Sequence, residues 1–388
     1  MKNRVLVFLS FFVSLLIIPV INILSVPDLA SLKWSKAFFY NMDFAVNRIS
    51  RLLYPYGISV SPKQVIIGRD GWLYLGDKEG QTLTVDRSPP TEADRALGEK
   101  IGSAAQAWDA YLSGKGVKLF RIMVGPNKGS IYPDQLPVWA RPPSPNVADT
   151  LFAGTGELRY IDLRKPLLVA KALQLEALYY KADTHWNRLG AGIAFRAFGR
   201  QVAEAAPELR WPPETAYEII RVEPRAGGDL ANFLRIRDLP DVEPVVRVSD
   251  LSVQTTQFYL HTKTSIRPGG NPVVGALAEP ILVTSEGALN YKKVLWLRDS
   301  FGIAMSPFMA ATFSDVLQIS WHDVKTPEKF AQLIDEFKPE YVFVTVVERD
   351  SREKFFITLP PAISVPEAKE GGPATGTGGD SGRINLPK

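Results

Sequence analysis

The sequence predicts an α/β fold: a parallel sheet flanked by helices, with a loop- and β-rich insertion and an N-terminal transmembrane anchor. Apolar runs of strand length occur at residues 293–297, 316–321 and 341–347, and a helical pattern at 327–337 separates the last two. Continuous apolar strands that alternate with helices are typical of parallel sheets covered on both faces. The anchor is predicted from residues 5–24, which contain no charged side chain.

The composition is that of an ordinary globular protein. Of 388 residues, 46% are hydrophobic and 22% are charged, which allows a sizeable core and excludes a wholly disordered, fibrous or polytopic membrane chain. The formal net charge of +4 is small and dispersed, so nucleic acid is not an expected partner. The lack of cysteine excludes disulfides, thiolate metal sites, iron–sulfur clusters and a cysteine nucleophile.

Residues 1–27 are expected to form the anchor. The apolar run is long enough to cross about 30 Å of hydrocarbon as a helix. Lys2 and Arg4 precede it and Asp28 follows, so the positive-inside bias places the N-terminus in the cytoplasm and the rest of the chain across the membrane. A cleaved signal peptide would begin in the same way, but the run does not end in a small-residue cleavage site, which favours an uncleaved anchor.

Residues 28–60 are predicted to contain one amphipathic juxtamembrane helix. Its apolar positions recur at spacings of three and four, at Trp34, Phe38, Met42, Ala45, Ile49, Leu52 and Tyr56. The apolar face either packs on the globular domain or meets a membrane partner or the bilayer surface.

Residues 61–360 are predicted to form the globular domain. Two β-rich runs within residues 65–75 surround a Gly-Arg-Asp-Gly turn and predict a hairpin. Thr91 is a plausible start for a helix, and the apolar run 117–124 that follows this helix suits a buried strand.

Two parts of the chain lack these regular patterns. Between about residues 211 and 287 the helical period fades, and we expect an irregular insertion of loops and short strands. Residues 361–388 are rich in glycine and proline and have hardly any apolar pattern, so we expect a disordered tail.

The sequence offers three histidines as candidates for a general base: His185, His261 and His322. His261 lies in the irregular insertion, where a surface role is the default. His322 is followed directly by Asp323, but neighbours on an extended segment point to opposite faces, so that aspartate is poorly placed to orient the ring.

His185 lies in a polar loop, two residues after Asp183 and just before a helical pattern. In this i, i+2 arrangement the carboxylate can bind one ring nitrogen while the other remains free to act. A nucleophilic serine requires such a pair, because its hydroxyl is inert near neutral pH until a base takes its proton. The alternative is a helix cap at Asp183 or Asn187 beside a packed neutral histidine.

Ser300 is the candidate nucleophile. It follows a predicted buried strand, in the turn Arg298-Asp299-Ser300-Phe301-Gly302, and precedes a helical run. Sites in open α/β sheets form at such strand ends, where helix amides can stabilise an oxyanion. The alternative is that Ser300 or Asp299 is only a helix N-cap.

Three further residues are candidate oxyanion or substrate contacts. Asn127 follows the strand at 117–124 and could supply an amide donor, although turn chemistry explains the Gly-Pro-Asn sequence as well. Gly228 could offer backbone amides or belong to a simple turn. Trp139 lies in a proline-rich loop compatible with stacking on a sugar ring.

Five motifs occur in order between about residues 60 and 310: Gly68-Arg69-Asp70-Gly71-Trp72-Leu73-Tyr74, Pro126-Asn127-Lys128 with Ile131-Tyr132-Pro133-Asp134-Gln135-Leu136-Pro137, Asp183-Thr184-His185-Trp186, Gly228-Asp229-Leu230, and Arg298-Asp299-Ser300-Phe301. Together they resemble the SGNH-hydrolase-like polysaccharide O-acetyltransferases of the alginate AlgJ/AlgX type. The specific part is the Asp-x-His-Trp motif followed far downstream by Asp-Ser-Phe.

The resemblance implies a Ser300–His185–Asp183 triad in an exported domain, with no required metal or cofactor. It implies a membrane-bound O-acyltransferase as acyl donor and a polysaccharide as acceptor. The anchor and the lack of a following carbohydrate-binding module make the chain more similar to AlgJ than to AlgX. Arg298 stands where the SGNH pattern usually has glycine, so it is expected to affect the turn and the approach to the oxyanion site, and it is a fourth candidate oxyanion or substrate contact.

The sequence therefore predicts an O-acetyltransferase that transfers an acyl group through a Ser300 acyl-enzyme to hydroxyls of an exported polysaccharide. The expected acyl group is acetyl. The expected location is the bacterial inner membrane, with a single span and the catalytic domain in the periplasm. A carbohydrate acetylesterase would use the same three residues with water as acceptor. A non-catalytic anchored subunit of a polysaccharide export or modification complex would carry them without using them.

Overall fold

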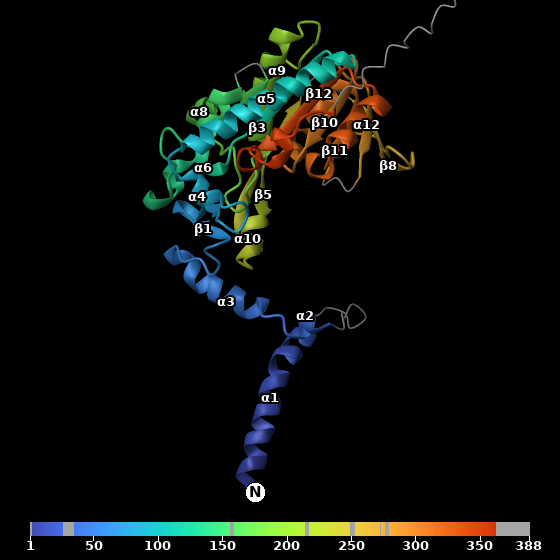
Figure 1. Cartoon of the computed structure of the whole chain (residues 1–388). Helices are drawn as coiled ribbons and strands as arrows, with labels where there is room; N and C mark the ends of the chain where they lie inside the picture. Colours follow the sequence, from blue (N-terminus) through green and yellow to red (C-terminus); the bar gives the residue numbers. More distant parts are fainter. Residues whose placement is uncertain are drawn as a thin grey trace, which may run out of the picture.

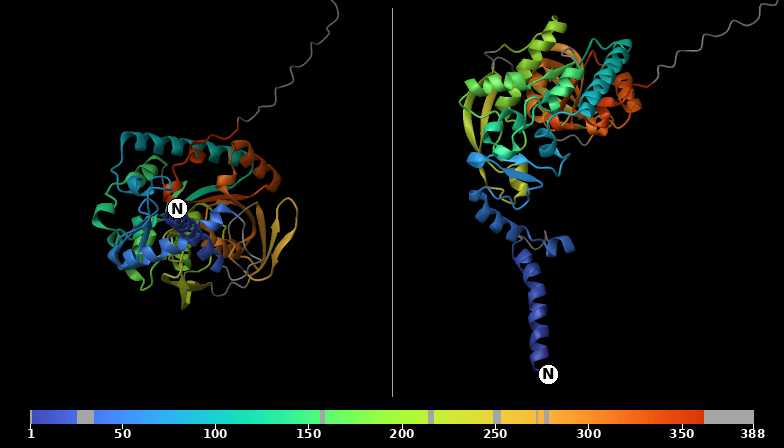
Figure 2. Two further views of the ribbon diagram at one scale, coloured as in Figure 1. Left: turned by 90° about the horizontal axis from the view of Figure 1, so that it is seen from below. Right: turned by 60° about the vertical axis from the view of Figure 1, so that its left-hand side comes forward.

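The computed structural model describes residues 2–25, 35–155, 159–213, 217–248, 253–271, 273–275 and 279–361. An α/β body contains most of these residues, and the helix α1 projects away from it at the N-terminus (Figures 1 and 2). Apart from its first residue, the tail predicted at 361–388 lies outside the described residues.

An eight-stranded sheet with strand order β4-β3-β12-β10-β11-β9-β7-β8 forms the centre of this body. Five adjacent strands run parallel: β4 (Tyr160–Asp162), β3 (Leu119–Gly125), β12 (Tyr341–Val347), β10 (Asn290–Arg298) and β11 (Phe313–Ser320). Three antiparallel strands extend the sheet beyond β11: β9 (Ile281–Glu286), β7 (Gln254–Tyr259) and β8 (Ser265–Pro268). The predicted α/β class is confirmed, but the sheet is mixed rather than parallel throughout.

Helices cover both faces of the sheet. Tyr341 and Phe343 of β12 belong to the apolar cluster beneath α9 (Arg188–Ala205) and α11 (Gly302–Thr312). The alternate residues Val342 and Val344 belong to the opposite cluster, beneath α5 (Glu92–Gly114) and α12 (Pro327–Phe337). Because successive side chains of a strand point to opposite faces, this alternation explains why the central strands contain runs of consecutive apolar residues.

Short elements surround the edge of the sheet where the parallel strands end. The predicted hairpin is present as β1 and β2, and Asp70 in its turn has a positive φ of 50°. The elements are β1 (Val65–Ile67), β2 (Leu73–Leu75), α4 (Thr82–Asp86), α6 (Lys128–Ile131), α7 (Val147–Thr155), α8 (Arg164–Leu173) and α10 (Asp229–Phe233).

The insertion expected at residues 211–287 is more regular than its sequence indicates. Its strands β5 (Tyr217–Ala226) and β6 (Pro240–Val248) form a long antiparallel ribbon outside the central sheet. Ile220 and Val222 of β5 are each 41% exposed. The ribbon is thus only partly buried, which explains why it lacks a clear apolar alternation in the sequence.

The N-terminal region contains α1 (Lys2–Leu24), α2 (Lys36–Phe39) and α3 (Asp43–Leu53). The prediction of one amphipathic helix is wrong, because the chain breaks between α2 and α3. At the break, Asn41 Oδ1 accepts a hydrogen bond from the Asp43 amide, and Asn22 Nδ2 of α1 donates to the Phe39 and Asn41 carbonyls. Across the described residues, no helix combines the length and apolar character needed to cross a membrane. The anchor therefore stays a prediction.

Candidate active site

Ser300 lies in the tight turn between β10 and α11, at the carboxyl end of a central parallel strand. Buried Asp299 shapes this turn: its Oδ1 accepts from the Phe301 amide at 2.9 Å and its Oδ2 from the Val347 amide at 2.6 Å. The turn is thereby tied to the end of the neighbouring strand β12, while Ser300 itself is exposed. Among the described residues, no acceptor is found for the Ser300 amide, so this donor is available to a ligand.

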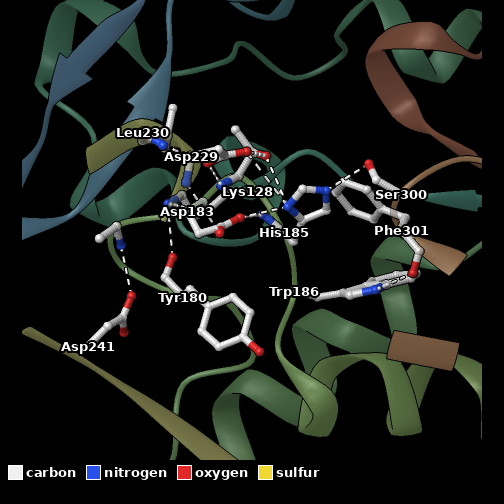
Figure 3. Close-up of polar contacts among 12 residues, drawn as sticks. Lys128, Tyr180, Asp183, His185, Trp186, Asp229, Leu230, Asp241, Ser300 and Phe301 are labelled. Atoms are coloured by element: carbon white, nitrogen blue, oxygen red, sulfur yellow. Dashed lines mark hydrogen bonds and ion pairs between the residues drawn. The ribbon is translucent and has the colours of Figure 1, made fainter. Parts of the chain in front are cut away.

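The structure brings His185 and Asp183 to this serine from a separate loop. His185 Nε2 lies 2.7 Å from Ser300 Oγ, and His185 Nδ1 lies 2.6 Å from Asp183 Oδ1 (Figure 3). The imidazole therefore bridges a hydroxyl and a carboxylate within hydrogen-bond distance of each. This is the geometry that a serine nucleophile requires.

Arg225 of β5 supplies a positive charge behind Asp183. Its Nη2 donates to Asp183 Oδ2 at 3.0 Å, and its guanidinium lies 3.7 Å from the centre of the Tyr180 ring. Burial disfavours the ionised carboxylate, but hydrogen bonds and charge from His185 and Arg225 outweigh it and hold the pKa of Asp183 below its usual range. Asp183 is thus held as a carboxylate facing the imidazole.

Asp229, at the start of α10, fixes the middle residue of the Asp-x-His motif. Its carboxylate accepts hydrogen bonds from the Thr184 amide at 2.8 Å and from the Thr184 hydroxyl. Gly228 precedes it with φ 154°, and a Cβ there would lie 2.4 Å from the Ala182 carbonyl oxygen. Gly228, predicted as an oxyanion contact, therefore packs against the Asp183 loop, where only glycine permits the close approach.

Trp186 joins the histidine loop to the serine turn. Its indole Nε1 donates to the Phe301 carbonyl at 2.9 Å, and the two rings pack with centroids 4.9 Å apart (Figure 3). Trp186 is almost fully buried. The tryptophan of the motif thus holds together the two segments that carry His185 and Ser300.

Arg298 was predicted as a substrate contact, but its side chain does not face the surface. Its side chain is buried, and Nε donates to Gln318 Oε1 at 2.9 Å while Nη2 donates to the Val274 and Gly275 carbonyls. Burial lowers the pKa of Arg298 to about 10. The structure therefore corrects the prediction: Arg298 braces the turn from beneath, with its donors occupied by protein acceptors.

Asn127 lies at the end of β3 beside a small cavity. Its Nδ2 donates to both carboxylate oxygens of Asp86 at 3.0 and 3.1 Å, and its backbone amide donates to Glu348 Oε2. Burial raises the pKa of both Asp86 and Glu348. The side-chain amide of Asn127 is therefore bound to the Asp86 carboxylate, and its role as an oxyanion donor stays a prediction.

The same cavity extends from Asn127 to Thr184 beside the triad and to Arg349, whose guanidinium lies 5.8 Å from the centre of the Phe301 ring. Leu83, Leu136, Ala140 and Pro142 form much of its apolar wall. Trp139 lies on the neighbouring turn, is 57% exposed and has the Arg87 guanidinium 5.9 Å from its ring. An exposed ring in this position is compatible with the predicted sugar stacking.

The other histidines have different surroundings. His322 stacks on Trp321 with ring centroids 3.6 Å apart, and exposed His261 lies 3.7 Å from a carboxylate oxygen of Glu336. Within the part of the chain that the structure describes, one group of ligand atoms, from Asp183, His185 and Asp229, is close enough to hold a metal ion, with all atoms within 4.8 Å of one another. These atoms also make the contacts of the triad, so a bound ion would compete with that arrangement.

The structure brings the three residues predicted as a triad into contact, but the residues that hold them in place were not predicted. Arg225 is in the insertion that carries no pattern, and Asp229 was noted only as part of a motif. The order of the motifs places Asp229 after Asp183 in the sequence. Its role, however, depends on its contact with Thr184, which joins two distant segments and leaves no local pattern.

Comparison with known proteins identifies the domain type. Residues 65–263 match the family model described as SGNH hydrolase-like domain, acetyltransferase AlgX. The matched range includes Asp183 and His185 and ends before Ser300.

Two relatives are similar over much of the chain, and both are described as a probable alginate O-acetylase AlgJ. The protein from Pseudomonas fluorescens is 28% identical over 276 residues, which cover 64% of this chain and 66% of that protein, just under two thirds. The protein from Pseudomonas syringae pv. tomato is 27% identical over 378 residues, which cover 87% of this chain and 89% of that protein.

A solved structure shares the fold. PatB1 from Bacillus cereus superposes with a TM-score of 0.54 and 14% identity, over 75% of this chain and 98% of that one. At this identity the likeness shows the fold alone.

Proposed function

We propose that this chain, which belongs to the AlgX family of SGNH hydrolase-like acetyltransferases, transfers an acetyl group to hydroxyls of a polysaccharide through an acyl-enzyme on Ser300. The observation that carries the proposal is the continuous chain of contacts from Ser300 Oγ through His185 to Asp183, with distances of 2.7 and 2.6 Å. The likeness to the AlgJ proteins supports the choice of acetyl and polysaccharide.

In the first step His185 Nε2 takes the proton from Ser300 Oγ as the oxygen bonds to the carbonyl carbon of the acetyl donor. Asp183 holds the ring in the required tautomer and stabilises the imidazolium that forms. The tetrahedral intermediate then collapses: the donor's leaving group departs with the proton from His185, and acetyl-Ser300 remains.

In the second step a sugar hydroxyl attacks the acetyl-Ser300 carbonyl while His185 takes the hydroxyl proton. Collapse of this second intermediate gives the acetylated sugar and returns the proton to Ser300. In both steps the developing oxyanion needs donors, and the Ser300 amide beside the start of α11 is one available to it. Asn127 is the proposed second donor, after release of its amide from Asp86.

A transfer assay tests this function. Purified protein is incubated with an activated acetyl ester and an oligosaccharide, and both acetylated sugar and free acetate are measured. We expect acetylated sugar with the native chain and with Ser103→Ala, which removes an exposed hydroxyl on α5, but none with Ser300→Ala. Acetate alone would favour the esterase, and unchanged glycan acetylation in Ser300→Ala would favour the non-catalytic subunit.

The proposed setting is the periplasmic side of a bacterial inner membrane, next to a membrane-bound O-acyltransferase that supplies the acetyl group. The orientation of α3 supports a membrane-facing surface. Its polar groups bind the domain, where Arg51 pairs with Asp238 and Asp43 with Arg235. Its apolar positions Ile49 and Leu52 are 51 and 68% exposed, and Tyr56, in the turn that follows α3, is 76% exposed.

An apolar stripe on the side opposite the domain contacts suits a bilayer surface or a membrane protein. Membrane fractionation of the full chain tests this setting. We expect the protein to stay in the membrane fraction after an alkaline carbonate wash, with the catalytic domain accessible to protease from the periplasmic side. Recovery of the full-length chain in the soluble fraction would contradict the anchor.

A further inference from the structure

Lys128 is a buried lysine that the acyl-transfer steps above do not use. It lies in the first turn of α6, is 5% exposed, and points at the loop before His185 (Figure 3). Its Nζ donates to the Tyr180 carbonyl at 3.0 Å, the Lys181 carbonyl at 3.0 Å and the Asp183 carbonyl at 2.7 Å. One ammonium group thus collects three backbone oxygens from four consecutive residues.

This arrangement requires the charged form of the side chain. Three carbonyl oxygens that converge on one point repel each other, and an ammonium group has three N–H donors to satisfy them. A neutral amine has only two donors and presents a lone pair to the third oxygen. The loop that holds Asp183 therefore keeps this conformation only while Lys128 is protonated.

The ammonium group of Lys128 has both aromatic rings and carboxylates near it. Rings lie on one side, with Trp72 5.6 Å and Tyr74 5.2 Å from Nζ to the ring centres. Burial lowers the pKa of Lys128 to about 7, against the attraction of the carboxylates of Asp229, Asp183 and Asp241. The group therefore changes charge near neutral pH.

We propose that Lys128 is a positioning residue for acyl transfer, whose ammonium group clamps residues 180–183 and so keeps Asp183 and His185 aligned with Ser300. The proposal rests on the acyl-transfer function given above. Lys128 does not touch the reacting atoms; it acts through the loop.

The clamp gives a distinctive pH dependence. Above a pH of about 7 Lys128 loses its proton, and turnover should fall as the loop loosens. Stability should not fall for the same reason. The unfolded chain keeps this proton up to the ordinary lysine pKa of 10.5, so across this interval the contribution of Lys128 to folding becomes more favourable as the pH rises. We therefore expect activity to fall as the pH rises above neutral while the protein stays folded.

Replacement of the ammonium group tests the clamp. Lys128→Met keeps most of the side chain but removes the charge, and Lys100→Met, which removes the charge of an exposed lysine on α5, is the matched control. We expect kcat in Lys128→Met to fall about 100-fold, the size of effect that a 1 Å misplacement can have, with KM for the activated acetyl ester within twofold. The fall in activity near neutral pH should also disappear, while Lys100→Met keeps the native profile.

An unchanged kcat, or a native pH profile in Lys128→Met, would overturn the proposal. If that variant does not fold, proton NMR of the native protein gives the answer, through the low-field signal of the His185 Nδ1 proton bound to Asp183. We expect this signal to weaken with rising pH in step with activity; a signal that stays constant while activity falls would also overturn it. Failure of the native protein to acetylate Ser300 would instead count against the acyl-transfer function.

Discussion

Two buried aspartates lie beside His185 and Ser300, and they differ in what they bind. Asp183, two residues before His185, faces the imidazole and the Arg225 guanidinium. Asp299, directly before Ser300, faces the backbone amides of Phe301 and Val347. The pKa of Asp183 is held below its usual range, whereas burial raises that of Asp299 despite those amides and the charge of Arg349. In the proposed mechanism the Asp183 carboxylate is the electrostatic partner of His185, whereas the Asp299 carboxylate holds the serine turn against β12.

Among substitutions that test this difference between the two aspartates, Asp183→Asn should have the largest effect, a loss of activity. The amide cannot hold the imidazole in the tautomer that accepts the serine proton, so the rate of Ser300 acetylation should fall about 10⁴-fold. Single-turnover acetylation followed by mass spectrometry measures this rate. A fall of less than about tenfold would mean that Asp183 is not the partner of His185.

Asp299→Asn should instead act mainly on stability. An amide nitrogen would replace one carboxylate oxygen and face a backbone N–H, leaving a buried donor unpaired at a cost of about 1–3 kcal/mol. The raised pKa sets the sign of the pH dependence. As the pH rises from about 4, Asp299 releases its proton more readily in the unfolded chain than in the folded one, so the native protein becomes less stable. The variant has no proton to release at this position, and its stability does not change for this reason.

The stability difference between native protein and Asp299→Asn should therefore be larger at pH 4 than at pH 7. Denaturant unfolding at the two pH values measures it. A loss of activity at full stability would show that Asp299, too, takes part in the chemistry and would remove the contrast between the aspartates.

The smallest effect is expected for Arg225→Met. Without the guanidinium, the pKa of Asp183 should rise toward its ordinary value, but the contact with His185 remains. Turnover should fall by no more than about tenfold, the factor that corresponds to about 1.4 kcal/mol. Steady-state kinetics checks this, and a fall as large as that of Asp183→Asn would mean that Arg225 and Asp183 act as one unit.

The sequence was sufficient to place Ser300, His185 and Asp183 in one candidate site because each has a local signal. Asp183 and His185 share one short loop, and Ser300 follows a strand whose apolar pattern is unmistakable. The rule that sites form at the carboxyl ends of parallel strands then places the serine at an exposed edge. The same local signals predicted the hairpin and the helices α5 and α12.

The supports could not be predicted because their contacts join distant segments. Arg225 and Asp183 are 42 residues apart, and Lys128 and Asp183 are 55 residues apart. Arg298 was misinterpreted for the same reason: its partner Gln318 lies on β11, and the sequence does not tell which strand neighbours β10. The antiparallel edge of the sheet was missed because its three strands follow the ribbon in a stretch of sequence where the helical period fades and no clear apolar alternation replaces it.

The central claim is that Ser300 carries the acetyl group between donor and sugar. The most direct test is to stop the reaction with an activated acetyl ester in acid, digest the protein and locate the acetyl group by tandem mass spectrometry. We expect one acetyl group on the peptide that contains Ser300, absent in His185→Ala and discharged in the native protein by added oligosaccharide. An adduct located elsewhere, or one formed equally in His185→Ala, would contradict it.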